Sequence, residues 1–411
     1  MAGALSHLRV LDLSRILAGP WASQLLADLG AEVIKIERPG VGDDTRHWGP
    51  PYLADETGAP TSEAAYYLGA NRNKRSVTID ITTPDGQQLV RDLAAKSDVV
   101  IENFKVGGLK QYGLDYDSLR AVNPKLVVCS ITGFGQTGPY APRAGYDFLI
   151  QGMGGLMSLT GRPDEVEGGG PMKVGVALTD ILTGLYASNA VLAAIAYRDR
   201  DGFRAGDGQH IDLALLDVQV ACLANQAMNY LTSGKAPQRL GNAHPNIVPY
   251  QDFPTADGYM ILAIGNDAQF ARFCESAGQP ALAADTRFAT NAARVANRDV
   301  LIPKLNALTV TRSTTEWITR LETLAVPCGP INTVADVFDD PQVQARGLRV
   351  DLPHPLAGTA PQVACPIRLS GTPVSYRNAP PVLGADTDAV LAELLDLGAG
   401  ARADLHARKI I

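Results

Sequence analysis

The stretch DLSRILAGPWASQLLADLGAEVIKIERPG, Asp12–Gly40, predicts the opening unit of a dinucleotide-binding fold. Its apolar pattern, together with the residues just before it, predicts a buried strand, a helix and a second strand at residues 8–13, 21–29 and 32–37. A nicotinamide-binding unit has a glycine-rich first turn and an acid that holds the ribose at the end of its second strand. Here the turn contains only Gly19, and the acid Glu37 is followed at once by Arg38. The unit therefore predicts a nucleotide ligand but argues against a nicotinamide dinucleotide.

The composition is ordinary for a globular protein, and it excludes several classes of function. The chain has 411 residues, of which 46% are apolar and 19% charged, and its net charge of −7 argues against nucleic-acid binding. The apolar stretch 174–197 is interrupted by polar residues, and the N-terminus lacks the pattern of an export signal, so neither membrane insertion nor secretion is expected. Five scattered cysteines and six dispersed histidines indicate reduced thiols, a cytoplasmic location and no metal site.

Strands and helices alternate through the first half of the chain, which predicts a parallel sheet covered on both faces. The strands are expected at 76–81, 98–102 and 125–131 and the helices at 84–96, 117–122 and 179–198. The fold class expected is α/β, with a Rossmann-like large domain built from both termini and a smaller inserted α+β domain. The large domain is expected at residues 1–200 and 330–411 and the small domain at 225–325, with linkers at 200–225 and 325–330. A final helix is expected over 386–395, with Asp386 or Thr387 capping its first turn.

Asp180, within the string MKVGVALTDILTGLYAS, is the first candidate for chemistry. Because it stands among apolar residues where a helix should begin, spacing alone favours a helix cap. The alternative is a carboxylate that the positive end of the helix keeps ionised in a dry pocket, where it can attack an acyl carbon. Glycines lie nearby in the sequence and suit either tight turns or backbone N–H groups that approach an oxyanion.

Polar or aromatic side chains follow two of the predicted strands. Arg38 suits a phosphate, Asn103 can bond an amide or a base, and Phe104 offers a flat face, although each also suits an ordinary loop. Because the carboxyl ends of parallel strands meet at one edge of the sheet, these groups together predict a site for a nucleotide-containing ligand.

The whole chain resembles the family III CoA-transferases, also called the CaiB/BaiF family. The strings that carry the resemblance are VLDLSRILAGPWASQLLADLGAEVIKIERPGVGDDTR, NRNKRSVTIDI, DVVIENFKVGGL, GYDFLIQGMGGLMSLTG, GVALTDILTGLYA, VPCGPINTVADVFDDPQ and PPVLGADTDAVL. One such string would be a weak signal, whereas all of them in this order are specific.

The resemblance implies that the first unit binds coenzyme A and that Asp180 is the nucleophile. The implied CoA contacts are Ile16, Leu17, Arg38, Ile79, Asn103, Phe104, Tyr146 and Asp147. Formyl-CoA transferases carry a glutamine where Leu17 stands and an arginine where Gln111 stands, which weakens any expectation of oxalate chemistry. The family also implies an interlocked homodimer, CoA and acyl-CoA as substrates, and no tightly bound cofactor.

The implied reaction is ping-pong transfer through an aspartyl–acyl anhydride and an aspartyl-CoA thioester. A racemase of the same fold is the alternative, but it needs a histidine base where this chain has Tyr146, whose ordinary pKa is too high for that role. A CoA-binding protein without catalysis is a further alternative, and the presence of Asp180 argues against it.

Three strings resemble the succinate–hydroxymethylglutarate branch of the family, which handles glutarate: SQLLADLGAEVIKIERPGVGDDTRHWGPPY, QVACLANQAMNYLTSG and GNAHPNIVPYQDF. The resemblance implies succinyl-CoA as donor and a short dicarboxylate, such as glutarate or 3-hydroxy-3-methylglutarate, as acceptor. A cation is then needed for the distal carboxylate. The candidates for substrate contact are Arg15, Arg143 and His244, with Gly154 and Gly155 as candidate oxyanion donors.

Overall fold

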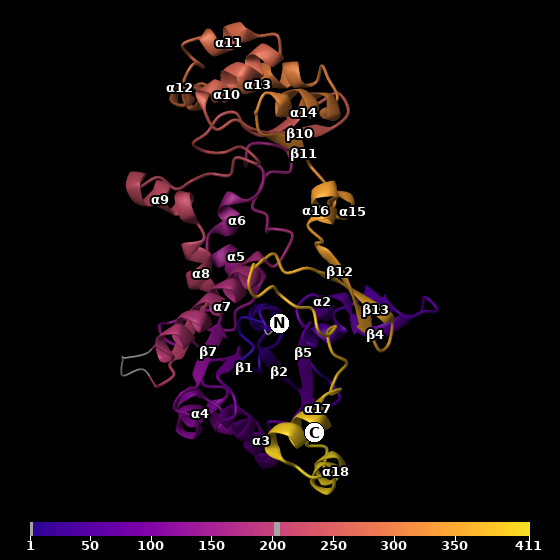
Figure 1. Cartoon of the computed structure of the whole chain (residues 1–411). Coiled ribbons are helices and arrows are strands. Elements are labelled where there is room, and N and C mark those ends of the chain that lie inside the picture. The colour runs from indigo at the N-terminus through magenta and orange to yellow at the C-terminus, as the bar shows by residue number, and fades with distance from the viewer. Residues whose placement is uncertain (1–2, 201–205) are drawn as a thin grey trace. The chain divides into compact units, whose positions relative to one another are not determined.

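A computed structural model describes residues 3–200 and 206–411, and the chain divides into two compact units. The larger unit contains the chain up to Leu156, Lys173–Gly234 and Gln344–Ile411, and the smaller contains Met157–Met172 and Lys235–Val343. Both ends of the chain thus contribute to the larger unit (Figure 1). The smaller unit differs in range from the expected domain at 225–325, because it also takes in residues 157–172 and continues to residue 343.

A six-stranded sheet forms the centre of the larger unit, in the order β5-β2-β1-β6-β7-β8. Every neighbouring pair is parallel. The strands are β1 (Arg9–Asp12), β2 (Glu32–Glu37), β5 (Lys74–Thr78), β6 (Val99–Glu102), β7 (Val127–Thr132) and β8 (His210–Ala214). The strand order reverses between β1 and β6, which is where doubly wound sheets bind their ligands.

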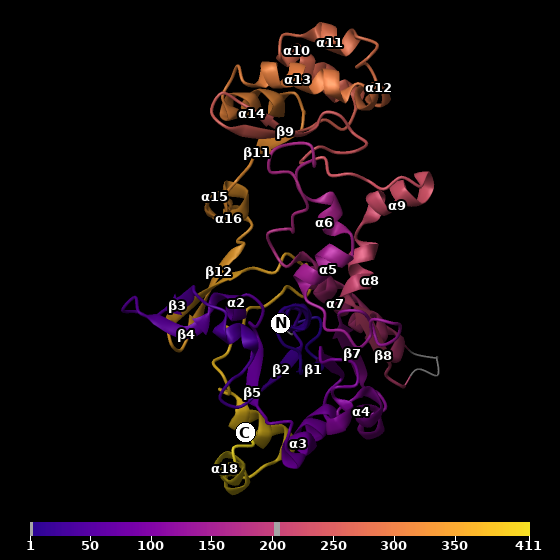
Figure 2. The same ribbon diagram turned by 180° about the vertical axis from the view of Figure 1, so that it is seen from behind.

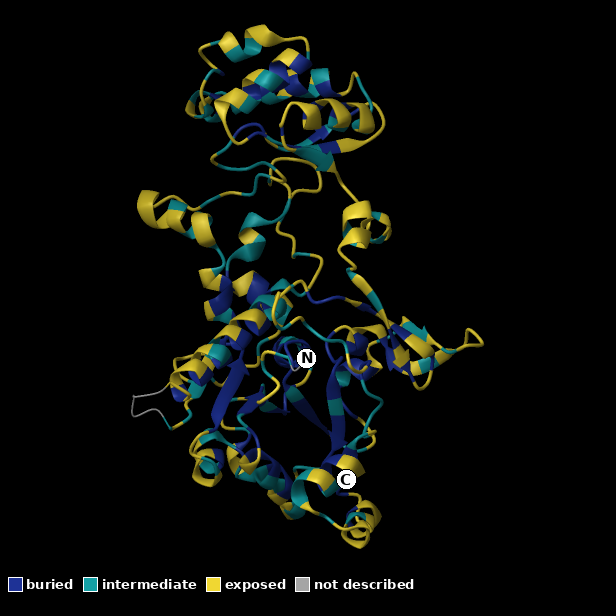
Figure 3. Cartoon of the chain, in the orientation of Figure 1, coloured by how far each residue is buried: buried dark blue, intermediate teal, exposed yellow. Residues whose placement is uncertain are grey.

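Helices cover both faces of this sheet, so its strands are buried on both sides (Figure 3), except for the edge strand β8, which is only partly buried. One face packs against α3 (Pro84–Ala95), α4 (Tyr116–Val122), α17 (Thr387–Leu395) and α18 (Ala399–Ala407). The other face packs against α1 (Ala18–Asp28), α5 (Asp147–Met153), α7 (Leu178–Arg198) and α8 (Leu215–Ala221). Side chains alternate between the two faces of β1, with Val10 in one core and Leu11 in the other. The predicted α/β class with a parallel sheet is confirmed.

The strand β8 and the helix α8 lie inside the stretch 200–225 that was expected to be a linker. β8 pairs in parallel with β7 over five residues, from His210 to Ala214, and so completes the sheet at the edge opposite β5 (Figure 2). The prediction of a linker is wrong for this part, because the exposed edge of β7 takes up the backbone of residues 210–214. Residues 201–205 of the expected linker lie outside the described residues.

The C-terminal segment returns to the free edge of β5. Asp386 Oδ2 accepts a hydrogen bond from Ser76 N at 2.9 Å, and Thr387 Oγ1 accepts one from Thr78 N at 2.9 Å. Farther along, the N–H of Asp80 donates to the carbonyl oxygen of Ile410 at 2.8 Å. The prediction that Asp386 or Thr387 caps the first turn of α17 is wrong, since the N-cap makes no side-chain bond and both side chains bond β5 instead.

α7 is the one helix of the described residues whose length and apolar composition would suit a membrane span. It packs along α1 and β7, and 44% of its apolar 18-residue stretch is buried inside the protein. Its apolar composition is therefore explained by its place in the core of the larger unit.

The smaller unit has its own core, around Phe253, Met260, Phe270 and Trp317. Its antiparallel sheet has the order β11-β10-β9, with β9 (Tyr250–Pro254), β10 (Tyr259–Ala263) and β11 (Cys328–Pro330). The helices that lie wholly within this unit are α10 (Asp267–Ser276), α11 (Pro280–Ala284), α12 (Asn291–Ala296), α13 (Arg298–Thr309), α14 (Thr314–Thr323) and α15 (Val334–Asp339). The chain passes from the smaller to the larger unit within α16 (Pro341–Ala345).

The remaining elements are short. Two hairpins belong to the larger unit, one of β3 (Tyr52–Ala54) and β4 (Pro60–Ala64), the other of β12 (Arg349–His354) and β13 (Gly358–Val363). The other helices are α2 (Ala65–Leu68), α6 (Leu156–Leu159), α9 (Ala224–Ser233) and the 3-10 turns at Asp44–His47 and Lys110–Tyr112.

Candidate active site

Two adjoining cavities lie at the carboxyl ends of the central strands. The first, of about 370 Å³, is lined by the turn after β1, the segment after β6, the start of the loop after β7, the segment before α5 and Asp180. The second, of about 340 Å³, is lined by segments that follow β2 and β5. Arg15, Phe104 and Tyr112 line both cavities, so the two adjoin at these side chains.

The structure brings most of the predicted CoA contacts to these two cavities. The first is lined by Ile16, Leu17, Asn103, Phe104 and Tyr146 together with Asp180. Arg38 and Ile79 line the second, and Phe104 lies on both. Asp147 does not line either cavity and bonds the backbone at Asp180 instead.

Asp180 lies in the first turn of α7, but its side chain does not cap that helix. Asp147 Oδ1 accepts hydrogen bonds from the backbone N–H of Thr179 at 2.8 Å and of Asp180 at 3.3 Å. Because Asp147 is the first residue of α5, the start of one helix caps the start of the other. The interpretation of Asp180 as a helix cap is wrong, and its half-buried carboxyl group lines the first cavity instead.

The pKa of Asp180 is raised from 3.8 to about 7. Burial of the carboxyl group is the larger cause, and the negative charge of Asp147 is the second. The positive end of α7 was expected to keep Asp180 ionised. Instead, Asp147 takes up the free amides and adds a like charge, so Asp180 holds its proton to a much higher pH than an ordinary aspartate does.

Tyr66, on α2, is a neighbour of Asp180 that the sequence did not predict. Burial raises the pKa of its phenol, and the charges of Asp180 and Asp147 raise it further. The ring of Tyr66 meets that of Trp48 edge to face, with centroids 5.1 Å apart. No motif in the sequence marked this tyrosine, because its neighbourhood depends on the packing of α2.

The two candidate arginines differ in their partners. Arg15 Nη1 forms an ion pair of 3.1 Å with Asp44, whereas no described carboxylate pairs with Arg143. The guanidinium of Arg143 lies over the rings of Tyr140 and Phe134, at 4.6 and 5.1 Å from their centroids. Both arginines line the first cavity, and Arg143 has the more available charge.

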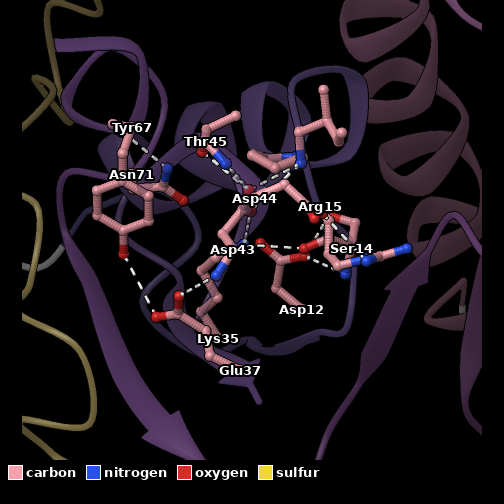
Figure 4. Close-up of polar contacts among 12 residues, drawn as sticks. Asp12, Ser14, Arg15, Lys35, Glu37, Asp43, Asp44, Thr45, Tyr67 and Asn71 are labelled. Atoms are coloured by element: carbon pink, nitrogen blue, oxygen red, sulfur yellow. Dashed lines mark hydrogen bonds and ion pairs between the residues drawn. The ribbon is translucent and has the colours of Figure 1, made fainter. Parts of the chain in front are cut away.

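The turn after β1 is held in an unusual conformation by side chains from elsewhere. Ile16 has a φ of +73°, which is rare for a β-branched residue, and its N–H lies 3.2 and 3.3 Å from the two carboxylate oxygens of Asp43. Lys35 Nζ donates to the carbonyl oxygen of Ser14 at 2.8 Å and pairs with Asp43 at 2.9 Å (Figure 4). One buried ion pair therefore holds both sides of the turn.

Asn103 holds Arg15, the residue between Ser14 and Ile16. Its Oδ1 accepts from Arg15 N at 2.9 Å, and its Nδ2 donates to Arg15 O at 2.7 Å. The carboxamide that was expected to contact CoA thus also bonds the backbone of the turn.

Buried charges extend beneath this turn (Figure 4). Asp12 accepts hydrogen bonds from Ser14 and Ser23 and pairs with Lys74 at 3.1 Å. Burial would raise the pKa of Asp12, but the charges of Lys74 and Lys35 and the hydrogen bonds of the two serines together outweigh it and lower the pKa to about 2. The sequence signal for this buried cluster was Asp12, a charged residue at an apolar strand.

Glu37 shows why this unit does not hold a ribose as a nicotinamide-binding unit does. Both oxygens of its carboxylate accept from Arg46, each at 2.8 Å, and Ser76 donates to it at 2.7 Å. The acid that would bind a ribose is therefore occupied within the protein.

The remaining candidates lie away from these cavities. Gly154 N donates to Ile150 O at 2.7 Å and Gly155 N to Gly152 O at 3.4 Å, both at the end of α5. His244 belongs to the smaller unit, where its Nδ1 accepts from the N–H of Asn246 at 3.0 Å. Their roles toward a substrate stay predictions.

A model of the family described as CoA-transferase family III matches residues 5–387 of the chain. The chain belongs to CoA-transferase family III. Among its relatives, the succinate–glutarate CoA-transferase of Agrobacterium fabrum is 56% identical over 390 residues, which cover 95% of each chain. The human succinyl-CoA:glutarate CoA-transferase is 43% identical over 391 residues, covering 95% of this chain and 86% of the human protein.

The solved structures agree with this assignment. A CaiB/BaiF family protein from Brucella suis has a TM-score of 0.83 and 53% identity, covering 96% of this chain and all of that one. Membership of family III makes the protein a transferase enzyme with CoA thioesters as substrates.

Proposed function

We propose that this family III enzyme transfers CoA from succinyl-CoA to a short dicarboxylate, with glutarate as the first acceptor to test and 3-hydroxy-3-methylglutarate as the second. The names of two relatives, from Agrobacterium fabrum and from human, support succinate and glutarate as the pair of acids. The observation that carries the proposal is the place of Asp180, whose carboxyl group lines a cavity together with the residues expected to contact CoA.

Asp180 acts as the nucleophile in this proposal. Its ionised carboxylate attacks the thioester carbon of succinyl-CoA, and the C–S bond breaks to give a succinyl–aspartyl anhydride and the CoA thiolate. The thiolate then attacks the aspartyl carbonyl, which releases succinate and leaves an aspartyl-CoA thioester. The carboxylate of the acceptor acid attacks this thioester, and the C–S bond breaks to give the CoA thiolate and a second anhydride. Attack by the thiolate on its acceptor carbonyl gives the new acyl-CoA and restores Asp180.

The raised pKa of Asp180 suits this chemistry. A carboxylate that burial and a neighbouring charge destabilise gains more on forming a neutral acyl bond than an exposed one does. Its proton must leave before the attack, so the reaction should become faster as the pH rises through about 7.

The two cavities suggest how CoA lies on the larger unit. Arg38 has an exposed side chain on the second cavity and would bind a phosphate at the nucleotide end. The chain of the ligand would pass Phe104, which lines both cavities, and reach the thiol end beside Ile16 and Asp180. Arg143 would bind the distal carboxylate of the acid, because its charge has no described carboxylate partner.

A homodimer belongs to the same proposal. Two helices of the larger unit expose apolar side chains: Phe148, Leu149 and Met153 on α5, and Met228 and Leu231 on α9. Such surfaces usually contact another protein surface. We expect an interlocked dimer, to be measured as twice the chain mass by light scattering.

The cysteines support a location in the cytoplasm. All five are free, which suits a compartment that keeps thiols reduced. We expect no tightly bound cofactor, nucleic acid or membrane partner.

Mass spectrometry of acyl-CoA products tests the reaction. The purified protein is incubated with succinyl-CoA and, separately, with glutarate, 3-hydroxy-3-methylglutarate, malate, itaconate, oxalate and carnitine. Glutaryl-CoA should form fastest, and Asp180→Asn should form none. The matched control is Asp217→Asn, which changes an exposed aspartate in the first turn of α8 and should keep full activity.

The intermediate provides a second readout. After incubation with succinyl-CoA, the peptide that contains Asp180 should carry the mass of CoA in the wild-type enzyme and in Asp217→Asn, but not in Asp180→Asn. Transfer to another acid alone would refute glutarate and keep the mechanism. Full activity of Asp180→Asn would refute the nucleophile.

A further inference from the structure

We propose that Lys35, Asp43 and Asn103 are positioning residues of the transferase. They hold the turn Ser14–Ile16 in its strained conformation, and this turn forms the wall of the first cavity beside Asp180. The inference rests on the proposed function for its kinetic part, because it states which residues place the thioester for attack.

The turn is held at four consecutive polar backbone groups, from the carbonyl oxygen of Ser14 to the N–H of Ile16. Lys35 donates to the carbonyl oxygen of Ser14, and Asn103 bonds both N and O of Arg15. The carboxylate of Asp43 accepts from the N–H of Ile16 through both oxygens. These three side chains come from β2, from the loop after β2 and from the end of β6, so the turn cannot shift without breaking contacts to two neighbouring strands.

Burial makes the ion pair between Lys35 and Asp43 rigid. The side chains are 1% and 0% exposed, and their charged groups lie 2.9 Å apart. Asp43 also accepts from the N–H and hydroxyl of Thr45, at 3.0 and 2.8 Å, and its own N–H donates to Glu37 at 2.9 Å (Figure 4). With this many bonds fixed at a fully buried group, the carboxylate has one orientation in which to receive the N–H of Ile16.

The conformation of Ile16 explains why the turn needs these three side chains to hold it. At a φ of +73° the β-carbon of an L-residue crowds its own backbone, and a branched side chain makes this worse. Strain of this kind persists only where the surroundings impose it, and it concentrates at functional sites. Without the three side chains, Ile16 would relax to a negative φ and would carry Arg15 and Leu17 away from their places on the cavity wall.

The turn contributes little to the packing of the two apolar cores. Among the described residues, the two apolar cores on the faces of the sheet include Leu13 and Ala18 but neither Ile16 nor Leu17. The strain therefore serves the shape of the cavity, where Ile16, Leu17 and Asp180 are all lining residues.

The test uses glycine to remove the strain without restoring the bonds. Glycine adopts a positive φ freely, whereas alanine keeps the strain of isoleucine, so Ile16→Ala is the matched control for Ile16→Gly. Asn103→Ala is made in each background, because Asn103 is only half-buried and its loss should leave the fold intact. Asp43→Asn, which keeps the shape of the side chain, is a second probe.

We expect Asn103→Ala to lower kcat about 10-fold in the Ile16→Ala background and less than about 3-fold in the Ile16→Gly background. The KM for succinyl-CoA should change little in either case. An equal loss in both backgrounds, or a loss carried by KM alone, would overturn the inference and would assign Asn103 to direct contact with CoA.

Hydrogen exchange separates this inference from the proposed function. Without any substrate, Asn103→Ala should speed amide exchange in the peptide that spans the turn, and Asp43→Asn should do the same, while exchange in α7 stays unchanged. Unchanged exchange in the turn would overturn the inference even if the enzyme is active. Faster exchange in these variants, combined with a wild-type protein that transfers no CoA, would keep the positioning residues and refute the proposed function.

Discussion

Replacing Asp180 with asparagine should make the protein more stable, and by a larger margin at pH 8 than at pH 5. The reason is the raised pKa of Asp180, about 7 in the folded protein against 3.8 as its ordinary value. A carboxyl group whose pKa is raised by folding gives its full stability below 3.8, and this contribution is lost as the pH rises through 7. Asparagine has no such loss, because it does not ionise.

The magnitude follows from the width of the pH window. From pH 5 to pH 7 the folded protein holds a proton that the unfolded chain has lost, and each pH unit reduces the stability by about 1.4 kcal/mol. Over these two pH units the loss of stability is at most about 3 kcal/mol. Because the carboxyl group is partly exposed to water, the expected loss is about 1–2 kcal/mol. For a chain of this length, 1 kcal/mol corresponds to a shift in Tm of about 1 °C.

Thermal unfolding of both proteins at pH 5 and pH 8 measures the effect. The Tm of Asp180→Asn should exceed that of the wild type by about 1–2 °C more at pH 8 than at pH 5. Asp180→Ala should show the same widening, because it also lacks the titrating group. An identical difference at both pH values would refute the raised pKa and, with it, the account of burial and like charge.

Three further predictions concern Asp147, Arg143 and Gly154. Asp147→Asn should move the midpoint of kcat/KM against pH below about 7, because removing a like charge lowers the pKa of Asp180, and a pH–rate profile measures this. Arg143→Ala should raise the KM for glutarate at least about 10-fold while CoA binding measured by calorimetry stays the same, and Arg143→Lys should recover part of the loss. Gly154→Ala should lower the stability by about 1–3 kcal/mol in urea unfolding, because the new methyl group would lie 2.4 Å from Gln219 Cγ.

The hydrophobic pattern predicted most of the larger unit. The strand β2 was predicted at Glu32–Glu37, where it lies, and α7 and α3 were predicted to within one residue at each end. These elements are buried by their own periodic faces, so local sequence is enough to locate them. The strand β5 was predicted a few residues too late, at 76–81, because the edge of the sheet is set by pairing with β2 rather than by local apolar residues.

The candidate site was predictable only for the residues that directly follow strands. Arg38, Asn103 and Phe104 follow strands directly, and the topology alone brings them to one edge of the sheet. The partners of the turn were not predictable, because Asp43 reaches Ile16 across 27 positions and Asn103 reaches Arg15 across 88. Such contacts depend on the tertiary fold. The sequence indicated buried charge only through charged residues inside apolar strands, such as Lys35.

The return of the C-terminal segment to β5 has a consequence for synthesis on the ribosome. The edge amides of Ser76, Thr78 and Asp80 are bonded by Asp386, Thr387 and Ile410, and the bonds of Asp386 and Thr387 join positions 310 and 309 residues apart. A nascent chain therefore carries an open sheet edge until these distant residues have been synthesised. Loss of the segment that carries them would leave β5 exposed to pairing with other chains.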